Sequence, residues 1–243
     1  MKIERHSPSS LNLFCASPAM FVLERILGQR QPVGSPAHRG TAVEAGVTKG
    51  LFSYAEDSIP IAIEEALQKY DVVSALSGDA RRDNYRKDIA PMVRSALEEL
   101  RPYGMPDGVQ GFVEWRPEGL KYPIVGFYDF MWSDHGIIVD LKTTERLPSD
   151  IKPGHARQVA LYCTSDNLSG RLAYVTPKKR AVYALENVRA HRECLYQIAL
   201  RCEAFLALSD DPEFYVSITA PDTESFYWSP PEARQAAFNT WRI

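Results

Sequence analysis

The sequence has little cysteine and no long hydrophobic run. No stretch of about 18 residues is apolar and uncharged throughout, and the N-terminus, MKIERHSPSSLNLF, lacks the continuous apolar segment of a secretory signal. These absences exclude a membrane-spanning helix, and we expect a cytoplasmic protein without a membrane partner. The four cysteines, at 15, 163, 194 and 202, are too scattered for a disulfide framework and contain no Cys-x-x-Cys pair. We therefore expect reduced thiols without a metal role.

The sequence also lacks a net positive charge, because its 28 Lys and Arg residues are outnumbered by 31 Asp and Glu residues, which gives a formal net charge of -3. A nucleic-acid site would therefore need a local basic surface. The 45% hydrophobic content allows a sizeable core, and no Gly/Ser/Pro-rich linker divides the 243 residues. We expect a single domain over 1–243, with a mainly helical N-terminal part (1–108), an αβ core (109–208) and a C-terminal extension (209–243).

The first half has helical periodicity. Apolar residues recur at helical spacing on both sides of Pro18, which predicts a broken helix, and again over 41–51, 60–76 and 82–101. The segment 41–51 carries Glu44. The N-terminal part is therefore expected to be all-helical.

The period changes at Val109. VQGFVEW, YPIVGFYDFMW and GIIVDLKTT are short runs rich in β-branched and aromatic residues, which predicts an antiparallel meander. A helix over 153–165, strands over 171–175 and 181–184 and a helix over 186–208 are expected to follow. The fold class is α/β, with a mixed central sheet of about four or five strands flanked by helices.

The run GIIVDLKTT places charge on a strand. Alternation puts Ile138, Asp140 and Lys142 on one face, so a carboxylate and an ammonium group share it. Asp129 in GFYDF lies nearly symmetrically across the hairpin from Asp140, within reach of a shared cation. Without a cation, repulsion would raise the pKa of one carboxyl. The alternative is a cross-strand ion-pair network on a solvated sheet face.

An aspartate is followed, after about ten residues, by Asp-x-Lys. This pattern resembles the PD-(D/E)XK nuclease superfamily. GFYDF, DLKTT and Gln158-x-x-x-Tyr162 look like successive motifs of its RecB-like and Cas4-like branch, including phage exonucleases. SPSSLNLFCASPAMFVLERILG and RGTAVEAGV resemble the opening segments of that branch, whereas 52–108 carry no resemblance. The resemblance implies a restriction-endonuclease-like core.

The resemblance also implies a ligand set. Glu44, Asp129, Asp140 and the backbone carbonyl of Leu141 would bind Mg²⁺, with Mn²⁺ as a substitute, and carboxylates suit these hard ions. Lys142 would orient or help deprotonate the attacking water. Gln158 and Tyr162, four residues apart on a helix, would position the substrate. The cysteine trio of iron–sulfur members is lacking, so no cluster is expected.

Several further residues have two interpretations each. Ser9 could bind a terminal phosphate or cap a helix. Arg39 could bind the same phosphate or be an ordinary surface arginine. Lys178 and Lys179, in TPKKR, could follow a phosphate backbone or occupy a solvated hairpin tip. Glu114 could be a further ligand or an exposed strand residue.

The implied function is a metal-dependent DNA exonuclease of repair or recombination, in a bacterial cell or a phage-infected host. A homo-oligomeric ring around DNA is implied by the family alone. The alternatives are a non-catalytic DNA- or protein-binding module with a nuclease-like fold and a structure-specific endonuclease. Substitution of Asp140 by Asn would separate an enzyme from the binding module, because only an enzyme would lose turnover.

Overall fold

The computed structural model describes residues 3–53, 58–165 and 167–243. The chain forms two compact units. The first comprises Met1–Pro32, Glu114–Gly126 and Arg189–Ile243, and the second comprises Val33–Val113 and Phe127–Val188. Among the helices in the described ranges, none is long and apolar enough to cross a membrane.

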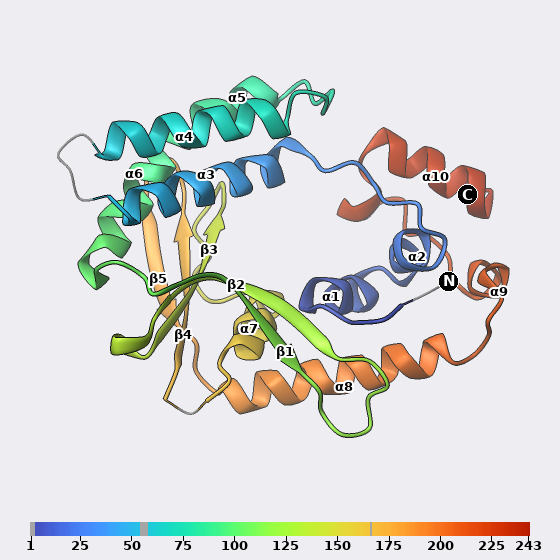
Figure 1. The fold of residues 1–243 in the computed structure, drawn as a ribbon. Coiled ribbons are helices and arrows are strands. Elements are labelled where there is room, and N and C mark those ends of the chain that lie inside the picture. Colours follow the sequence, from blue (N-terminus) through green and yellow to red (C-terminus); the bar gives the residue numbers. More distant parts are fainter. Residues whose placement is uncertain (1–2, 54–57, 166) are drawn as a thin grey trace. The chain divides into compact units, whose positions relative to one another are not determined.

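A five-stranded mixed sheet organises the fold, in the order β1-β2-β3-β4-β5 (Figure 1). Strand β2 pairs with β3 antiparallel, β3 with β4 parallel, and β4 with β5 antiparallel. The predicted mixed α/β sheet is therefore confirmed. The bounds are Gly108–Trp115 for β1, Ile124–Trp132 for β2, Ile137–Thr143 for β3, Ser169–Val175 for β4 and Arg180–Ala184 for β5.

Helix α7 (Pro153–Tyr162) makes the crossover between the parallel strands β3 and β4. Parallel neighbours need such a connection because a tight turn cannot join them. The helix ends at Tyr162, three residues earlier than predicted, and the backbone N–H of Cys163 bonds back to Val159. Close contact with the sheet explains the small residue at 170, since a Cβ at Gly170 would lie 2.5 Å from the Val159 side chain. The helix that carries residues 158 and 162 is thereby held against β4.

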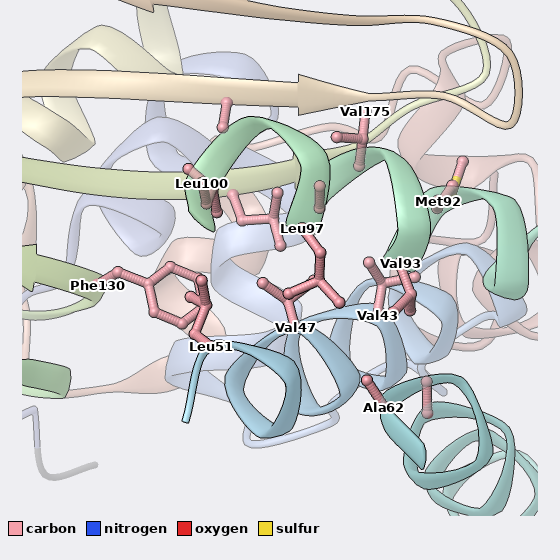
Figure 2. Close-up of a cluster of buried hydrophobic side chains, with 14 of the residues drawn as sticks. Val43, Val47, Leu51, Ala62, Met92, Val93, Leu97, Leu100, Phe130 and Val175 are labelled. Carbon is pink, nitrogen blue, oxygen red and sulfur yellow. The ribbon is translucent and has the colours of Figure 1, made fainter. Parts of the chain in front are cut away.

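Helices α3 and α6 of the second unit pack on the other side of β3 and β4. Val139 and Leu141 of β3 and Val175 of β4 share one buried cluster with the helices α3 and α6 (Figure 2). Helix α3 crosses α4 so closely that a Cβ at Gly46 would lie 2.5 Å from the carbonyl oxygen of Ala62. The bounds are Ser35–Leu51 for α3, Ser58–Val73 for α4, Arg82–Lys87 for α5, Ile89–Leu100 for α6 and Arg101–Tyr103 for the short helix η2.

Two details of this helical region differ from prediction. The helix expected over 82–101 is divided, with Asp88 between α5 and α6. The helix that carries Glu44 begins at Ser35 rather than residue 41, because Pro36 stands in its first turn, where a missing N–H costs nothing. The expected helical character of the region is nevertheless present.

The first unit is mainly helical. Ser7 caps α1 and forms a capping box with Ser10, so Ser9, two residues after the cap, lies inside the helix rather than at its cap. The all-helical prediction also misses a short parallel bridge between His6 and Ile124. Trp228 is buried against Ala19 and Leu23. The bounds are Pro8–Ala16 for α1, Pro18–Phe21 for α2, Val22–Ile26 for η1, Val188–Leu206 for α8, Pro212–Ile218 for α9, Phe226–Trp228 for η4 and Pro231–Trp241 for α10, while η3, at the turn between β2 and β3, spans Ser133–His135.

Candidate active site

Two aspartates meet where the β2–β3 hairpin stops pairing. The last paired residues are Phe130 and Val139, so Asp129 and Asp140 come next on the two strands, as the hairpin symmetry predicts. The Leu141 N–H donates instead to Asp129 Oδ2 at 2.7 Å. Asp129 is 8% exposed and Asp140 1% exposed. The hairpin therefore brings two carboxyl groups into one buried space.

Lys142 partners the deeper aspartate. Its Nζ lies 2.5 Å from Asp140 Oδ2, as an ion pair, and among the described residues Asp140 Oδ1 has no hydrogen-bond partner. Burial raises the pKa of Asp140, and Lys142 lowers it less than burial raises it. Burial lowers the pKa of Lys142, but the carboxylates of Asp140, Asp129 and Glu44 raise it, with a net rise. Lys142 is therefore an ammonium group in this arrangement.

Helix α3 adds a third carboxylate. Val43, Val47 and Leu51 bury one face of α3, and Glu44 lies beside that face. Burial, and next the charge of Asp140, raise the pKa of Glu44, and the same two causes raise the pKa of Asp129 well above its usual range. The three carboxylates therefore interact electrostatically.

Gln110 of β1 links two of these carboxylates. Its Nε2 donates to Glu44 Oε1 and, at 3.2 Å, to Asp129 Oδ1. Its backbone has φ of 50°, a left-handed conformation that few non-glycine residues adopt. Such strain is often kept at functional sites. Sequence reasoning missed this residue. Gln110 lies in the run VQGFVEW, but no pattern in that run points to the carboxylates.

The formal charge of the site matches a divalent cation. Three carboxylates and one ammonium group carry a formal charge of minus two, which one divalent ion would balance. Oxygen donors suit Mg²⁺, and the unpartnered Asp140 Oδ1 offers a buried ligand atom. In the described ranges, no three His, Cys, Asp or Glu side chains are already grouped as a metal site. The donor chemistry fits a hard cation, which would have to draw the carboxylates together.

Helix α7 supplies the neighbouring polar residues. Gln158 Nε2 donates to the hydroxyl of Tyr162 at 2.8 Å, so the two predicted positioning residues form one unit. Burial and the charge of Asp140 raise the pKa of Tyr162, which keeps its hydroxyl protonated. His155, to which the sequence assigned no function, lies on the same helix and bonds Tyr174 at 2.8 Å. Burial, then the charge of Lys142, lowers its pKa to about 4, so it is neutral at physiological pH.

The predicted phosphate-binding residues are placed differently. Arg39 is 2% exposed, pairs with Asp88 at 3.0 Å and lies over the ring of Tyr85. The expectation of a surface arginine is therefore wrong, and phosphate binding by Arg39 stays a prediction. Lys178 and Lys179 lie exposed in the β4–β5 turn, where their N–H groups donate to Thr176 Oγ1.

Two other candidates lie in the first unit. The Ser9 hydroxyl is hydrogen-bonded to that of Ser7 at 3.0 Å on the exposed side of α1. Glu114 is exposed and pairs with Arg116 at 2.7 Å, as its strand alternation allows. Their proposed substrate and metal roles stay predictions.

An open cleft of about 480 Å³ extends from Glu44 along α3 and α4. Glu44 and Gln110 line it at the site, and Lys49 and Lys69 add positive charge further along. The remaining lining residues are Thr41, Ala45, Thr48, Glu65 and Val109. The cleft offers a path for an extended anionic ligand toward the carboxylates.

Comparisons with known proteins give one family match. The family model described as PD-(D/E)XK nuclease superfamily matches residues 5–234. A solved structure titled "Crystal structure of SSO0001" is 13% identical, with a TM-score of 0.36 over 79% of this chain and 96% of that chain. No curated protein sequence matches the chain.

Proposed function

The chain belongs to the PD-(D/E)XK nuclease superfamily, and we propose from this premise that it is a Mg²⁺-dependent deoxyribonuclease acting as an exonuclease. One observation carries the proposal: Asp129, Asp140 and Lys142, with Glu44 beside them, occupy one electrostatically coupled site. A solvated ion-pair network does not account for this arrangement, because Asp140 is 1% exposed. Divalent metals are the general cofactor of this superfamily.

The carboxylates of Glu44, Asp129 and Asp140 and the carbonyl of Leu141 are the proposed ligands. When bound, Mg²⁺ supplies Lewis-acid polarisation of the scissile phosphate and of the attacking water. Mn²⁺, with similar oxygen chemistry, is the proposed substitute. The iron–sulfur cluster of related branches is not part of the proposal.

The chain's own residues supply the remaining chemistry. The Lys142 ammonium can hold the attacking water by a hydrogen bond and offset charge that develops on the phosphate oxygens. Gln158 and the protonated hydroxyl of Tyr162 can donate to the substrate and fix its position. Burial of Asp129 and Asp140 lowers the local dielectric, which strengthens each of these interactions.

DNA is the proposed substrate, and the cleft beside Glu44 supports it. Because the chain carries a net charge of -3, attraction for a polyanion must be local, and Lys49 and Lys69 contribute positive charge there that exceeds the charge of Glu65 once a cation offsets Glu44. We place the enzyme in DNA repair or recombination, in the cytoplasm of a bacterial or phage-infected cell. A ring-shaped oligomer is part of the proposal by family resemblance, and sedimentation analysis would test it.

The test uses end-labelled linear DNA and closed circular DNA, each with Mg²⁺, with Mn²⁺ and with chelator. We expect both ions to support degradation of the linear form from its ends while circles stay intact. Asp140→Asn should lose turnover and keep DNA affinity, and Asp71→Asn, which alters an ion-paired aspartate of α4, should act like the wild type.

Other outcomes identify the alternatives. Cleaved circles would indicate an endonuclease. DNA binding without cleavage under every metal condition would indicate a binding module. Degradation that persists in chelator would contradict the metal mechanism.

A further inference from the structure

Two exposed aromatic rings lie side by side near the carboxylates. Phe112 of β1 and Phe127 of β2 are 54% and 49% exposed, and their ring centroids are 5.4 Å apart with an interplanar angle of 55°. Exposure of large apolar side chains to water is unfavourable, and covering them would lower the free energy. An exposed aromatic pair on a β-sheet therefore indicates a surface that binds another flat, apolar group.

The pair adjoins the proposed metal site along the sheet. Gln110 on β1 contacts Asp129 on β2, and each phenylalanine stands two residues along its own strand from that contact. On β2, Phe127 and Asp129 are alternate residues of a strand, which share a face about 6.6 Å apart. The rings thus continue the carboxylate surface rather than forming a separate patch.

We propose that Phe112 and Phe127 form a stacking platform for an unpaired nucleobase of the strand that is cut. The occupant follows from continuity with the site: a strand whose phosphate meets Asp129 and Asp140 carries its bases within reach of the neighbouring surface. Each nucleobase has two flat faces, and exposed aromatic side chains bind bases of any sequence in this way. This inference rests on the proposed nuclease function.

The platform also defines the form of the substrate. Inside a duplex, both faces of a base are covered by its neighbours, so a base must leave the stack before Phe112 or Phe127 can contact it. A frayed or single-stranded end provides such a base without cost. The structure therefore assigns an unpaired strand end as the form of DNA that this site holds.

The test compares two single-stranded oligonucleotides, one intact and one with abasic positions near its end. Binding to the full chain is measured by fluorescence anisotropy in Ca²⁺. We expect the wild type to bind the intact strand roughly 5- to 150-fold more tightly, the range for one base stacked on an aromatic ring. The double variant Phe112→Leu/Phe127→Leu should lose this preference, and Phe112→Trp/Phe127→Trp should keep it.

A matched control is Phe52→Leu, because Phe52 is 48% exposed and follows Glu44 by eight residues at the end of α3. It should keep the preference, and thermal unfolding should show that all variants fold. Equal affinity of the wild type for both strands would overturn the platform, as would a double variant that still prefers the intact strand. A change only in oligomeric state would indicate instead a contact between copies. Cleavage assays in Mg²⁺ separate these results from failure of the nuclease proposal, in which no DNA is cut.

Discussion

Removing a carboxylate of the proposed metal site should stabilise the metal-free protein. Asp129→Asn takes away the carboxyl group whose pKa is raised well above its usual range, first by burial and then by Asp140 and Glu44. The two hydrogen bonds to Asp129 come from uncharged donors, Leu141 N–H and the Gln110 amide. An asparagine of nearly the same shape can keep the Leu141 bond. The variant should therefore relieve repulsion at little structural cost.

The sign of the pH effect follows from proton binding. With its pKa raised in the folded protein, Asp129 binds more protons when folded than when unfolded, so folding stability falls as pH rises from about 4 toward the raised value. Each unit of that rise lowers the wild-type free energy of unfolding by about 1.4 kcal/mol, which is about 3–6 °C in Tm for a chain of this size. The asparagine variant escapes this loss. Its advantage should be absent near pH 4 and grow toward neutral pH.

The assay is thermal unfolding of both proteins in chelator between pH 4 and pH 8. The quantity compared is the difference in stability between the two proteins. The lowered pKa values of His6 and His155 make the stability of both proteins rise with pH, and this effect cancels in the difference. Asp71→Asn is the control, since Arg86 lowers the pKa of Asp71 and the stability that this carboxylate contributes is already fully present above about pH 4–5, so its loss should lower stability by a nearly constant amount from there to pH 8. An Asp129→Asn variant less stable than the wild type at neutral pH would refute the reasoning.

Three further predictions concern neighbouring residues. Lys142→Met should reduce cleavage by about 10²–10³-fold, the usual loss for a transition-state charge partner, while Ca²⁺ binding measured calorimetrically stays equal or tightens; a loss of Ca²⁺ binding would contradict this role. Gln110→Ala should tighten Mn²⁺ binding by up to about tenfold, because the amide competes for Glu44 and Asp129 and a hydrogen bond to a charged group is worth about 1.5 kcal/mol; weaker binding would show that Gln110 assists the ion instead. Gly111→Ala should cost about 1–3 kcal/mol in denaturant unfolding, because its Cβ would lie 2.0 Å from the Tyr128 ring; Gly34→Ala, with 3.5 Å to its nearest neighbour, should cost far less, and equal losses would be inconsistent with this packing.

Much of the fold was predictable because strand and helix periods are local properties. The change of period at Val109, the alternation through Asp140 and the apolar face around Val43 each reflect burial on one side of an element. The ends of elements depend on contacts that are distant in sequence. The division at Asp88 and the bridge between His6 and Ile124 are examples that no local pattern shows. The single domain over 1–243 stays a prediction.

The site was predictable only where spacing fixes geometry. Hairpin symmetry sets Asp129 opposite Asp140, and helical spacing sets Gln158 beside Tyr162. The contact of Gln110 with two carboxylates depends on β1 lying next to β2 and on a left-handed backbone, and neither is encoded in residue spacing. The burial of Arg39 likewise depends on Asp88 and Tyr85, which lie more than forty residues away.

The central claim is that the carboxylates of Glu44, Asp129 and Asp140 jointly bind a divalent cation. Calorimetric titration of Mn²⁺ into the wild type, Glu44→Gln, Asp129→Asn and Asp140→Asn tests it most directly, with Asp71→Asn as the control. We predict one or two ions per wild-type chain and at least about tenfold weaker binding in each of the three variants, since a loss of about 10–100-fold already follows from removing a residue that only supports a ligand. Unchanged affinity and stoichiometry in all three would contradict the claim.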